Sequence, residues 1–335
     1  MDETTVNKNK IYLDHCFLRP GLPAGLYSGK AGILLSYSVL GMSHPSLFKT
    51  VAEVIEGELL TCDDYSFSEG ITGAGWALQV SAATGTDVGG CNALLMRIDD
   101  LVYRKTVQGK SKSLSLYSSN SALGKSFYFY QRVINQKDKP GDYYRGLVDK
   151  ECLILLISEV SDLLSVLIEN KNLLLPQLPH MLLEVGQSFI LLYHLLIENI
   201  NKDFVRKKLI YIRNFINDYF CNLLHIDSQN ACNVLYLLYV YALVAFDAKD
   251  KDMKTNAIRW IPEIIPLTLP FLKCNTDIYL AITCCNLCNI PLQISYQSPS
   301  YAPDFFLWDY CGNLLPWDRG DSSQYSSILK AFLLK

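Results

Sequence analysis

The chain carries little charge and no long hydrophobic run. Only 19% of its 335 residues are charged, and the formal net charge is −3. Without a basic excess, nucleic acid and anionic membranes are disfavoured as main partners. The longest unbroken apolar run, Val234 to Phe246, has 13 residues, whereas a helix that spans a bilayer needs about 20. We therefore expect a buried core helix there and no membrane insertion.

Signals for secretion and for a disulfide framework are also lacking. The opening segment, "MDETTVNKNK", is polar and has no apolar stretch of the kind found in secretory signals. The 11 cysteines are scattered and odd in number. In a chain without such a signal they favour reduced, mostly buried thiols. We therefore expect a cytoplasmic protein.

Strand signals are few, and helical periodicity is abundant. Between 202 and 224 the apolar residues recur at three- and four-residue steps, while Lys207, Lys208, Arg213 and Asp218 occupy other faces. The segments 46–60 and 91–103 show a weaker stripe of the same kind. These patterns predict helices that cover a core on one side and meet water on the other.

A second kind of segment is apolar nearly all round and includes 33–40, 189–197 and 234–246. A helix without a polar face is surrounded by protein. The two kinds alternate along the chain, which favours an all-α ring of helical hairpins with buried helices inside and amphipathic helices outside. We predict that 186–198 and 234–246 lie inside and that 204–224 lies outside.

The predicted architecture is thus a single α/α toroid over residues 1–335, in which the alternation shows about six hairpins. The tail 296–335 is rich in aromatic and turn-forming residues, and we expect it to pack on one rim and close the ring. The polar segments 110–121 and 135–144 are expected to be exposed loops.

Two glycine-rich stretches precede apolar runs, at 25–41 and at 70–85. A phosphate-binding loop needs G-x-x-x-x-G-K-S/T between a strand and a helix. Gly29-Lys30 is followed by Ala31, and Ser119 replaces the first glycine before Gly124-Lys125-Ser126. Glycine inside a helix costs about 1 kcal/mol relative to alanine and needs a compensating reason. We therefore interpret these glycines as positions where inner helices pack closely against their neighbours.

The stretches "GLYSGKAGILL" and "GITGAGWAL" resemble the glycine-rich inner-helix repeats of lanthionine synthetase C-like proteins. The resemblance implies an α/α toroid, typically of seven hairpins, with an active site in its central cavity, and a role in the modification or binding of a ribosomally synthesised peptide. In that family, two cysteines and one histidine bind a zinc ion, and an adjacent Cys-His pair precedes a glycine at the start of an inner helix.

No "CHG" occurs in this chain, and the matching places hold Tyr27-Ser28-Gly29 and Ser68-Glu69-Gly70 in the first two repeats. The later repeats, where the ligands would belong, hold Leu182-Leu183 and Gln229-Asn230. The resemblance therefore supplies no zinc ligand, and no cofactor is expected. An alternative set consists of Cys221 with His225 and Cys284 with Cys288, each spaced i, i+4, which could hold zinc if the two helix faces meet. Otherwise these residues are small apolar packing groups.

Candidate acids and bases are Asp63, Asp64 and Glu69, which precede an inner helix, and His180 and His194 on another. Acidic residues before a helix commonly serve as caps or dipole partners, while some helical toroids are glycosidases that use two carboxylates. The favoured hypothesis is a catalytically silent toroid that binds a peptide or a peptide-maturation enzyme. The alternative is an enzyme with a non-standard site, either a thioether cyclase or a carbohydrate-active toroid.

Overall fold

The computed structural model describes residues 23–26, 29–39, 45–58, 63–83, 91–136, 143–169, 178–223 and 225–272, together with a few positions between 281 and 288. The aromatic-rich tail 296–335 lies outside the described residues. In the described part, the secondary structure is helical apart from one isolated bridge between Ser113 and Ser121. This confirms the all-α class for that part of the chain.

The described residues divide into two compact units, one that ends at Leu163 and one that begins at Leu164. Helix α7 (Tyr143–Glu169) contributes residues to both units. The single toroidal domain expected from the sequence stays a prediction.

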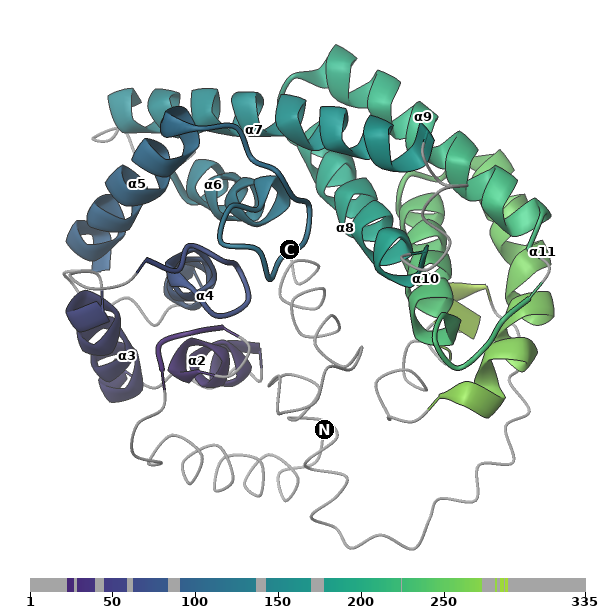
Figure 1. The fold of residues 1–335 in the computed structure, drawn as a ribbon, viewed down its shortest axis with the longest axis horizontal. Coiled ribbons are helices and arrows are strands. Elements are labelled where there is room, and N and C mark those ends of the chain that lie inside the picture. The colour runs from purple at the N-terminus through teal and green to yellow at the C-terminus, as the bar shows by residue number, and fades with distance from the viewer. Residues whose placement is uncertain are drawn as a thin grey trace, which may run out of the picture. The chain divides into compact units, whose positions relative to one another are not determined.

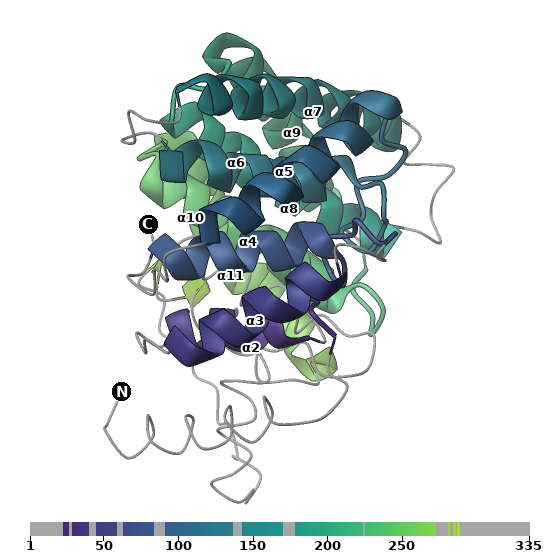
Figure 2. The ribbon, with the colours of Figure 1, turned by 90° about the vertical axis from the view of Figure 1, so that its left-hand side faces the viewer.

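The first unit contains a row of three helices covered by two others (Figure 1). Helices α2 (Lys30–Val39), α4 (Ile71–Ala83) and α6 (Ala122–Gln136) pack side by side in chain order. Helices α3 (Pro45–Glu58) and α5 (Cys91–Gln108) pack against this row, and both face the viewer in Figure 2.

Burial separates the two kinds of helix as the sequence pattern predicted. Every residue of α4 from Ile71 to Ser81 is buried, because this helix has small or apolar residues on all sides. On α5 only one stripe is buried, which includes Leu94, Ile98 and Val102. The row of three is therefore an inner layer, and α3 and α5 form its cover.

Within residues 178–272, the second unit repeats this arrangement with four helices. Helices α8 (Leu178–Ile197) and α10 (Ala231–Asp247) pack together, and α9 (Lys202–Cys221) and α11 (Lys251–Thr268) cover them. The short 3₁₀ turn Leu269–Phe271 follows α11. Among the described helices, none has the length and hydrophobicity needed to cross a bilayer.

The predicted layers of this unit are confirmed at the level of helices. The rings of Phe189 on α8 and Tyr241 on α10 are stacked with centroids 6.4 Å apart, and both residues are buried. Lys207 on α9 is exposed. Arg213 is about two-thirds buried and reaches Asp250 at 3.3 Å. Since neither basic residue is fully buried, α9 is an outer helix.

The glycine interpretation needs a correction. A Cβ at Gly29, Gly70 or Gly73 would collide with backbone of the segment just before the same helix, such as the carbonyl oxygens of Asp64 and Phe67. The missing side chains at these glycines therefore leave room for the loop that precedes the same helix, and not for a neighbouring helix. Close approach between helices occurs elsewhere: a Cβ at Gly75 would lie 2.8 Å from the ring of Tyr128 on α6.

The segment 110–121 forms a loop, as predicted, but it is not wholly exposed. Leu114 and Leu116 are 4% and 3% exposed and belong to the core of the first unit. The sequence does not indicate this burial, because polar residues surround both leucines and such a mixture is typical of a solvent-exposed loop. Most of the segment 135–144 falls either in α6 or α7 or outside the described residues.

Candidate functional site

The loops that precede the three inner helices of the first unit are joined to one another. We call residues 23–26 with Gly29, residues 63–70 and residues 111–121 the loop platform. The backbone N–H of Leu26 donates to the carbonyl of Ser68 at 3.0 Å, and the N–H groups of Phe67 and Ser68 donate to the carbonyl of Leu116 at 3.0 and 3.1 Å. Three segments distant in sequence thus meet at the amino ends of α2, α4 and α6.

Each loop also folds back onto the helix that follows it. The N–H groups of Lys30, Ile71 and Ala122 donate to loop carbonyls seven, seven and nine positions earlier, at 2.9, 3.1 and 2.9 Å. The first N–H groups of a helix have no partner within the helix, so these carbonyls satisfy them. The glycines are required here because any side chain would block the returning loop.

Asp64 and Ser66 organise the start of α4. The two carboxylate oxygens of Asp64 accept from the backbone N–H of Ser66 at 2.8 Å and from its hydroxyl at 3.1 Å. The Ser66 hydroxyl oxygen in turn accepts from the N–H groups of Glu69 and Gly70 at 3.2 and 3.0 Å. Asp64 is therefore held in a capping arrangement.

The other two acidic candidates lie on the same loop. Asp63 is exposed, and Glu69 is half-buried. The Oε2 of Glu69 lies 2.7 Å from where a Cβ on Gly25 would be, so the loop before α2 approaches this carboxylate closely. Of the three acids, Asp63 is the one that solvent or a ligand reaches most freely.

Lys125 is a further residue of this site. The sequence indicates it only as part of the segment that was compared with a phosphate-binding loop. It lies in the first turn of α6 with 1% exposure, and its Nζ donates to Oδ1 of Asn120 at 2.9 Å. Burial lowers the pKa of Lys125 to about 8, while the charge of Glu159 opposes this shift and that of Lys105 adds to it. An amine with such a pKa is partly neutral near pH 8, as general bases and nucleophiles require.

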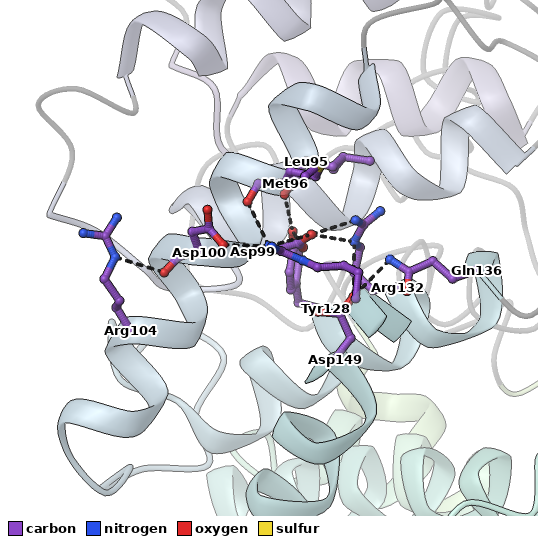
Figure 3. Close-up of polar contacts among 10 residues, drawn as sticks. Leu95, Met96, Asp99, Asp100, Arg104, Tyr128, Arg132, Gln136 and Asp149 are labelled. Carbon is purple, nitrogen blue, oxygen red and sulfur yellow. Dashed lines mark hydrogen bonds and ion pairs between the residues drawn. The ribbon is translucent and has the colours of Figure 1, made fainter. Parts of the chain in front are cut away.

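A second polar cluster lies between α5, α6 and α7 (Figure 3). Arg132 on α6 donates through Nη2 to Oδ2 of Asp99 on α5 at 2.6 Å, and the hydroxyl of Tyr128 donates to Oδ1 of the same carboxylate at 2.6 Å. Asp149 on α7 accepts from Nε2 of Gln136 at 3.0 Å. Its Oδ2 lies 3.9 Å from Nε of Arg132.

This cluster is closed to ligands. The side chains of Asp99, Arg132 and Asp149 are 1%, 4% and 1% exposed. Arg145, at the edge, reaches Asp99 at 3.4 Å and Asp100 at 2.8 Å. Burial, followed by the charge of Asp99, raises the pKa of Asp149 to about 6. These contacts link residues of α5, α6 and α7, so the cluster ties three helices together.

The histidine candidates lie on α8. The side chain of His180 is outside the described residues. His194 is half-buried near the end of the helix, with its ring centroid 6.0 Å from that of Tyr193.

The structure does not assemble the alternative zinc set in its described part. Cys221 and His225 are exposed, whereas Cys284 is buried and Cys288 half-buried. Burial raises the pKa of Cys288 to about 11, which favours the protonated thiol over the thiolate that binds zinc. Over the described residues, no three His, Cys, Asp or Glu side chains gather in a way that could hold a metal ion.

Comparison with known protein families, characterised proteins and solved structures finds no match to this chain. The resemblance to lanthionine synthetase C-like proteins therefore depends on the two glycine-rich stretches and on the alternation of helices. The first glycines of those stretches, Gly25 with Gly29 and Gly70, lie in the loop platform, and the stretches continue into α2 and α4.

Proposed function

We propose that this chain is an α/α toroid of the lanthionine synthetase C-like type, and that it binds a ribosomally synthesised peptide at the loop platform without cyclising it. The loop platform is the observation that carries the proposal. Three buried helices begin, in chain order, at interlocked loops, and a glycine stands directly before two of them, Gly29 before α2 and Gly70 before α4. In the family that the sequence resembles, an adjacent cysteine and histidine of the zinc site lie at the start of an inner helix.

The residues at those starts favour binding over cyclisation. At the places that match the family's Cys-His-Gly motif, this chain has Ser28-Gly29 and Glu69-Gly70 in its first two repeats. The later repeats, where the zinc ligands would belong, have Leu182-Leu183 and Gln229-Asn230. Asp64 is held by Ser66. Asp63 and Lys112 are exposed charges of opposite sign on two different loops of the platform. Such a surface complements a peptide that carries both charges.

The proposal is tested by selection from a library of linear 15-residue peptides displayed on phage. A selected peptide, labelled with fluorescein, should bind the full chain in an anisotropy titration. Because Asp63 is exposed on the platform, Asp63→Lys should weaken binding by about five-fold, or 1 kcal/mol. Glu151→Lys, which makes the same charge change at an exposed position of α7, should leave the affinity unchanged.

Two outcomes would contradict this function. One is the failure of any peptide to be enriched over a resin without protein. The other is an equal loss of affinity in both charge-reversal variants, since that would show a nonspecific effect of net charge.

A second candidate function is a thioether cyclase with a non-standard site, which the buried amine of Lys125 favours. In that reaction a thiolate adds to the double bond of a dehydrated serine or threonine, and a proton goes to the neighbouring carbon, so no atom is lost. The test uses a peptide that contains both a cysteine and a dehydrated serine or threonine. Cyclisation is measured as the loss of one thiol that can react with N-ethylmaleimide. Loss that depends on Lys125 would move this function ahead of binding.

A further inference from the structure

The segment from the last turns of α5 to the first turn of α6 carries charge of one sign only. Between 101 and 125 it has basic residues at five positions and no aspartate or glutamate, although acidic residues outnumber basic ones by 33 to 30 in the whole chain. Three of the five basic residues are exposed, namely Arg104 on α5 and Lys110 and Lys112 in the loop that follows. We call these three residues the basic edge.

The basic edge borders the loop platform within the unit that ends at Leu163. Lys112 is itself part of the platform, and the carbonyl of Lys110 accepts from Nδ2 of Asn120 at 3.2 Å. The same Asn120 side chain accepts through Oδ1 from Nζ of Lys125 at 2.9 Å. One side chain therefore joins the basic edge to the start of α6.

The two remaining basic residues of the segment add to the positive field. Burial is the largest cause that lowers the pKa of Lys125; the charge of Glu159 raises it, and the charge of Lys105 lowers it further. Among the described residues, the carboxylate bonded to this segment is that of Glu159, whose Oε2 accepts from the N–H of Ser111 at 3.2 Å. One half-buried carboxylate thus opposes a group of five cations.

The basic edge is not neutralised by its own neighbours. Nε of Arg104 donates to the backbone carbonyl of Asp100 at 3.1 Å, while the carboxylate of Asp100 pairs with Arg145 at 2.8 Å. In the part of the chain that the structure describes, the amines of Lys110 and Lys112 make no hydrogen bond or ion pair. The edge therefore presents cations to solvent.

Neither surface pairing nor the helix dipole accounts for this arrangement. The exposed cations Lys49 and Arg259 each have a glutamate one turn along their own helix, at 3.9 and 3.8 Å. The carbonyls at the end of a helix stabilise cations only within its last turn, and α5 ends at Gln108, before Lys110 and Lys112. A cluster of like charges attracts anionic groups to the surface around it.

Apolar side chains are exposed beside these cations. Tyr103 and Val107 are 40% and 52% exposed and lie one turn apart on α5, so they share a face of that helix. Tyr117, in the loop, is 49% exposed. The surface thus offers apolar contact together with positive charge, which suits a partner that has both acidic and apolar side chains.

We propose that the basic edge binds an acidic segment of a peptide, and that Tyr103 and Val107 contact an apolar residue next to that segment. Carboxylates can pair with the guanidinium of Arg104 through two hydrogen bonds and with the two lysines as point charges. The exposed Asp63 of the platform disfavours a long, uniform polyanion, whereas a peptide can place a basic residue there. The inference rests on the proposed function, because the ligand is the same peptide, and it specifies which charge that peptide carries.

The first experiment is an anisotropy titration of the full chain with a fluorescein-labelled peptide of five glutamates, two phenylalanines and three glycines. Lys110→Glu and Lys112→Glu should each weaken binding about five-fold, because each replaces an attraction by a repulsion. Lys150→Glu makes the same charge change at an exposed position of α7 and should alter the affinity less than about two-fold. All three positions are exposed, so thermal melts should show that the variants fold as the parent does.

Two further readouts separate charge pairing from apolar contact. A peptide with glutamine in place of each glutamate should bind the parent at least about ten-fold more weakly, and added salt should weaken binding of the acidic peptide. Val107→Ser should weaken binding about two-fold without changing this salt dependence, since it removes apolar area only. An equal loss of affinity in Lys110→Glu, Lys112→Glu and Lys150→Glu would overturn the proposal, because it would show an effect of net charge alone.

Other anionic partners are tested with a single strand of twenty thymidine nucleotides and with vesicles that contain phosphatidylglycerol. If either binds the parent more tightly than the acidic peptide does, and binding depends on Lys110 and Lys112, the edge recognises a polyanion or a lipid surface and the proposal is wrong.

The phage selection distinguishes failure of this inference from failure of the proposed function. If the selected peptides respond to Asp63→Lys but not to Lys110→Glu or Lys112→Glu, and the acidic peptide does not bind, the inference is wrong and the proposed function stands. If the acidic peptide binds at the basic edge while the selection enriches no peptide, the inference stands and the proposed function is wrong.

Discussion

Gly73 shows what a single missing side chain does in this fold. The carbonyl oxygen of Phe67 occupies the place where a Cβ on Gly73 would be. A backbone atom cannot rotate away as a flexible side chain can, so Gly73→Ala should destabilise the protein by about 3 kcal/mol or more, at the upper end of overpacking effects. Urea denaturation measures the change.

Gly57 on α3 is the matched control, because nothing lies within 4 Å of an added Cβ there. Gly57→Ala should stabilise the protein by up to about 1 kcal/mol through helix propensity. A harmless Gly73→Ala would show that the loop before α4 does not lie against that helix.

Asp149 should give the protein a measurable pH dependence. Its pKa is raised from 3.8 to about 6, first by burial and then by the charge of Asp99, against Arg132, Gln136 and Arg145. The folded state thus binds this proton more tightly than the unfolded state does, so stability is highest below about pH 4 and falls as the pH rises through 6. The loss is about 3 kcal/mol, since one pKa unit corresponds to about 1.4 kcal/mol.

Asp149→Asn should remove this part of the dependence. The free energy of unfolding of the variant minus that of the parent should become more positive between pH 4.5 and pH 7, measured by urea denaturation at both values. A constant difference over this range would mean that Asp149 is charged throughout and that Arg132 outweighs its burial.

At the scale of elements, Arg132 joins α6 to both of its neighbours in the ionic cluster. Removing it would leave Asp99 and Asp149 buried side by side without the guanidinium between them. Breaking a buried pair in this way costs about 3–5 kcal/mol, so Arg132→Leu should unfold at a much lower urea concentration. Arg97→Leu breaks the exposed pair of α5 with Glu56 of α3 and should cost less than about 1 kcal/mol. Equal effects would mean that the cluster contributes no more than a surface pair.

The helices themselves could be predicted well, because each kind has its own periodicity. The stripe at 202–224 corresponds to α9, and the apolar run at 234–246 lies within α10. The ends were harder to predict: the segment 91–103 continues as α5 to Gln108, since the stripe goes on through Val102 and Thr106. Sequence periodicity also could not reveal that Leu114 and Leu116 are buried, because their loop has no regular repeat.

For the molecule as a whole, we expect less than about a tenth of an equivalent of zinc in protein purified without added metal. Stable binding needs several deprotonated soft ligands at one place. The burial of Cys284, Cys285 and Cys288 raises the pKa of each thiol. Plasma mass spectrometry measures the metal content. A stoichiometric zinc signal that disappears in Cys288→Ser would reverse this prediction and favour the enzyme.

Two properties of the protein follow from its sequence alone. Helical periodicity determines that the described chain is all-α, and the contrast between α4 and α5, or between α10 and α9, determines which helices are buried. Both depend on hydrophobic patterns within about twenty residues, which a linear chain displays directly.

Contacts between distant segments were decided only in three dimensions. The loop platform depends on backbone bonds from Leu26 to Ser68 and from Phe67 to Leu116, which no side-chain pattern encodes. The shared carboxylate of Asp99 and the lowered pKa of Lys125 arise because separate helices exclude water from charged groups. Burial and hydrogen-bond partners are properties of the packed chain. The short stretch of sequence around each residue therefore does not reveal that its pKa or its bonding is unusual.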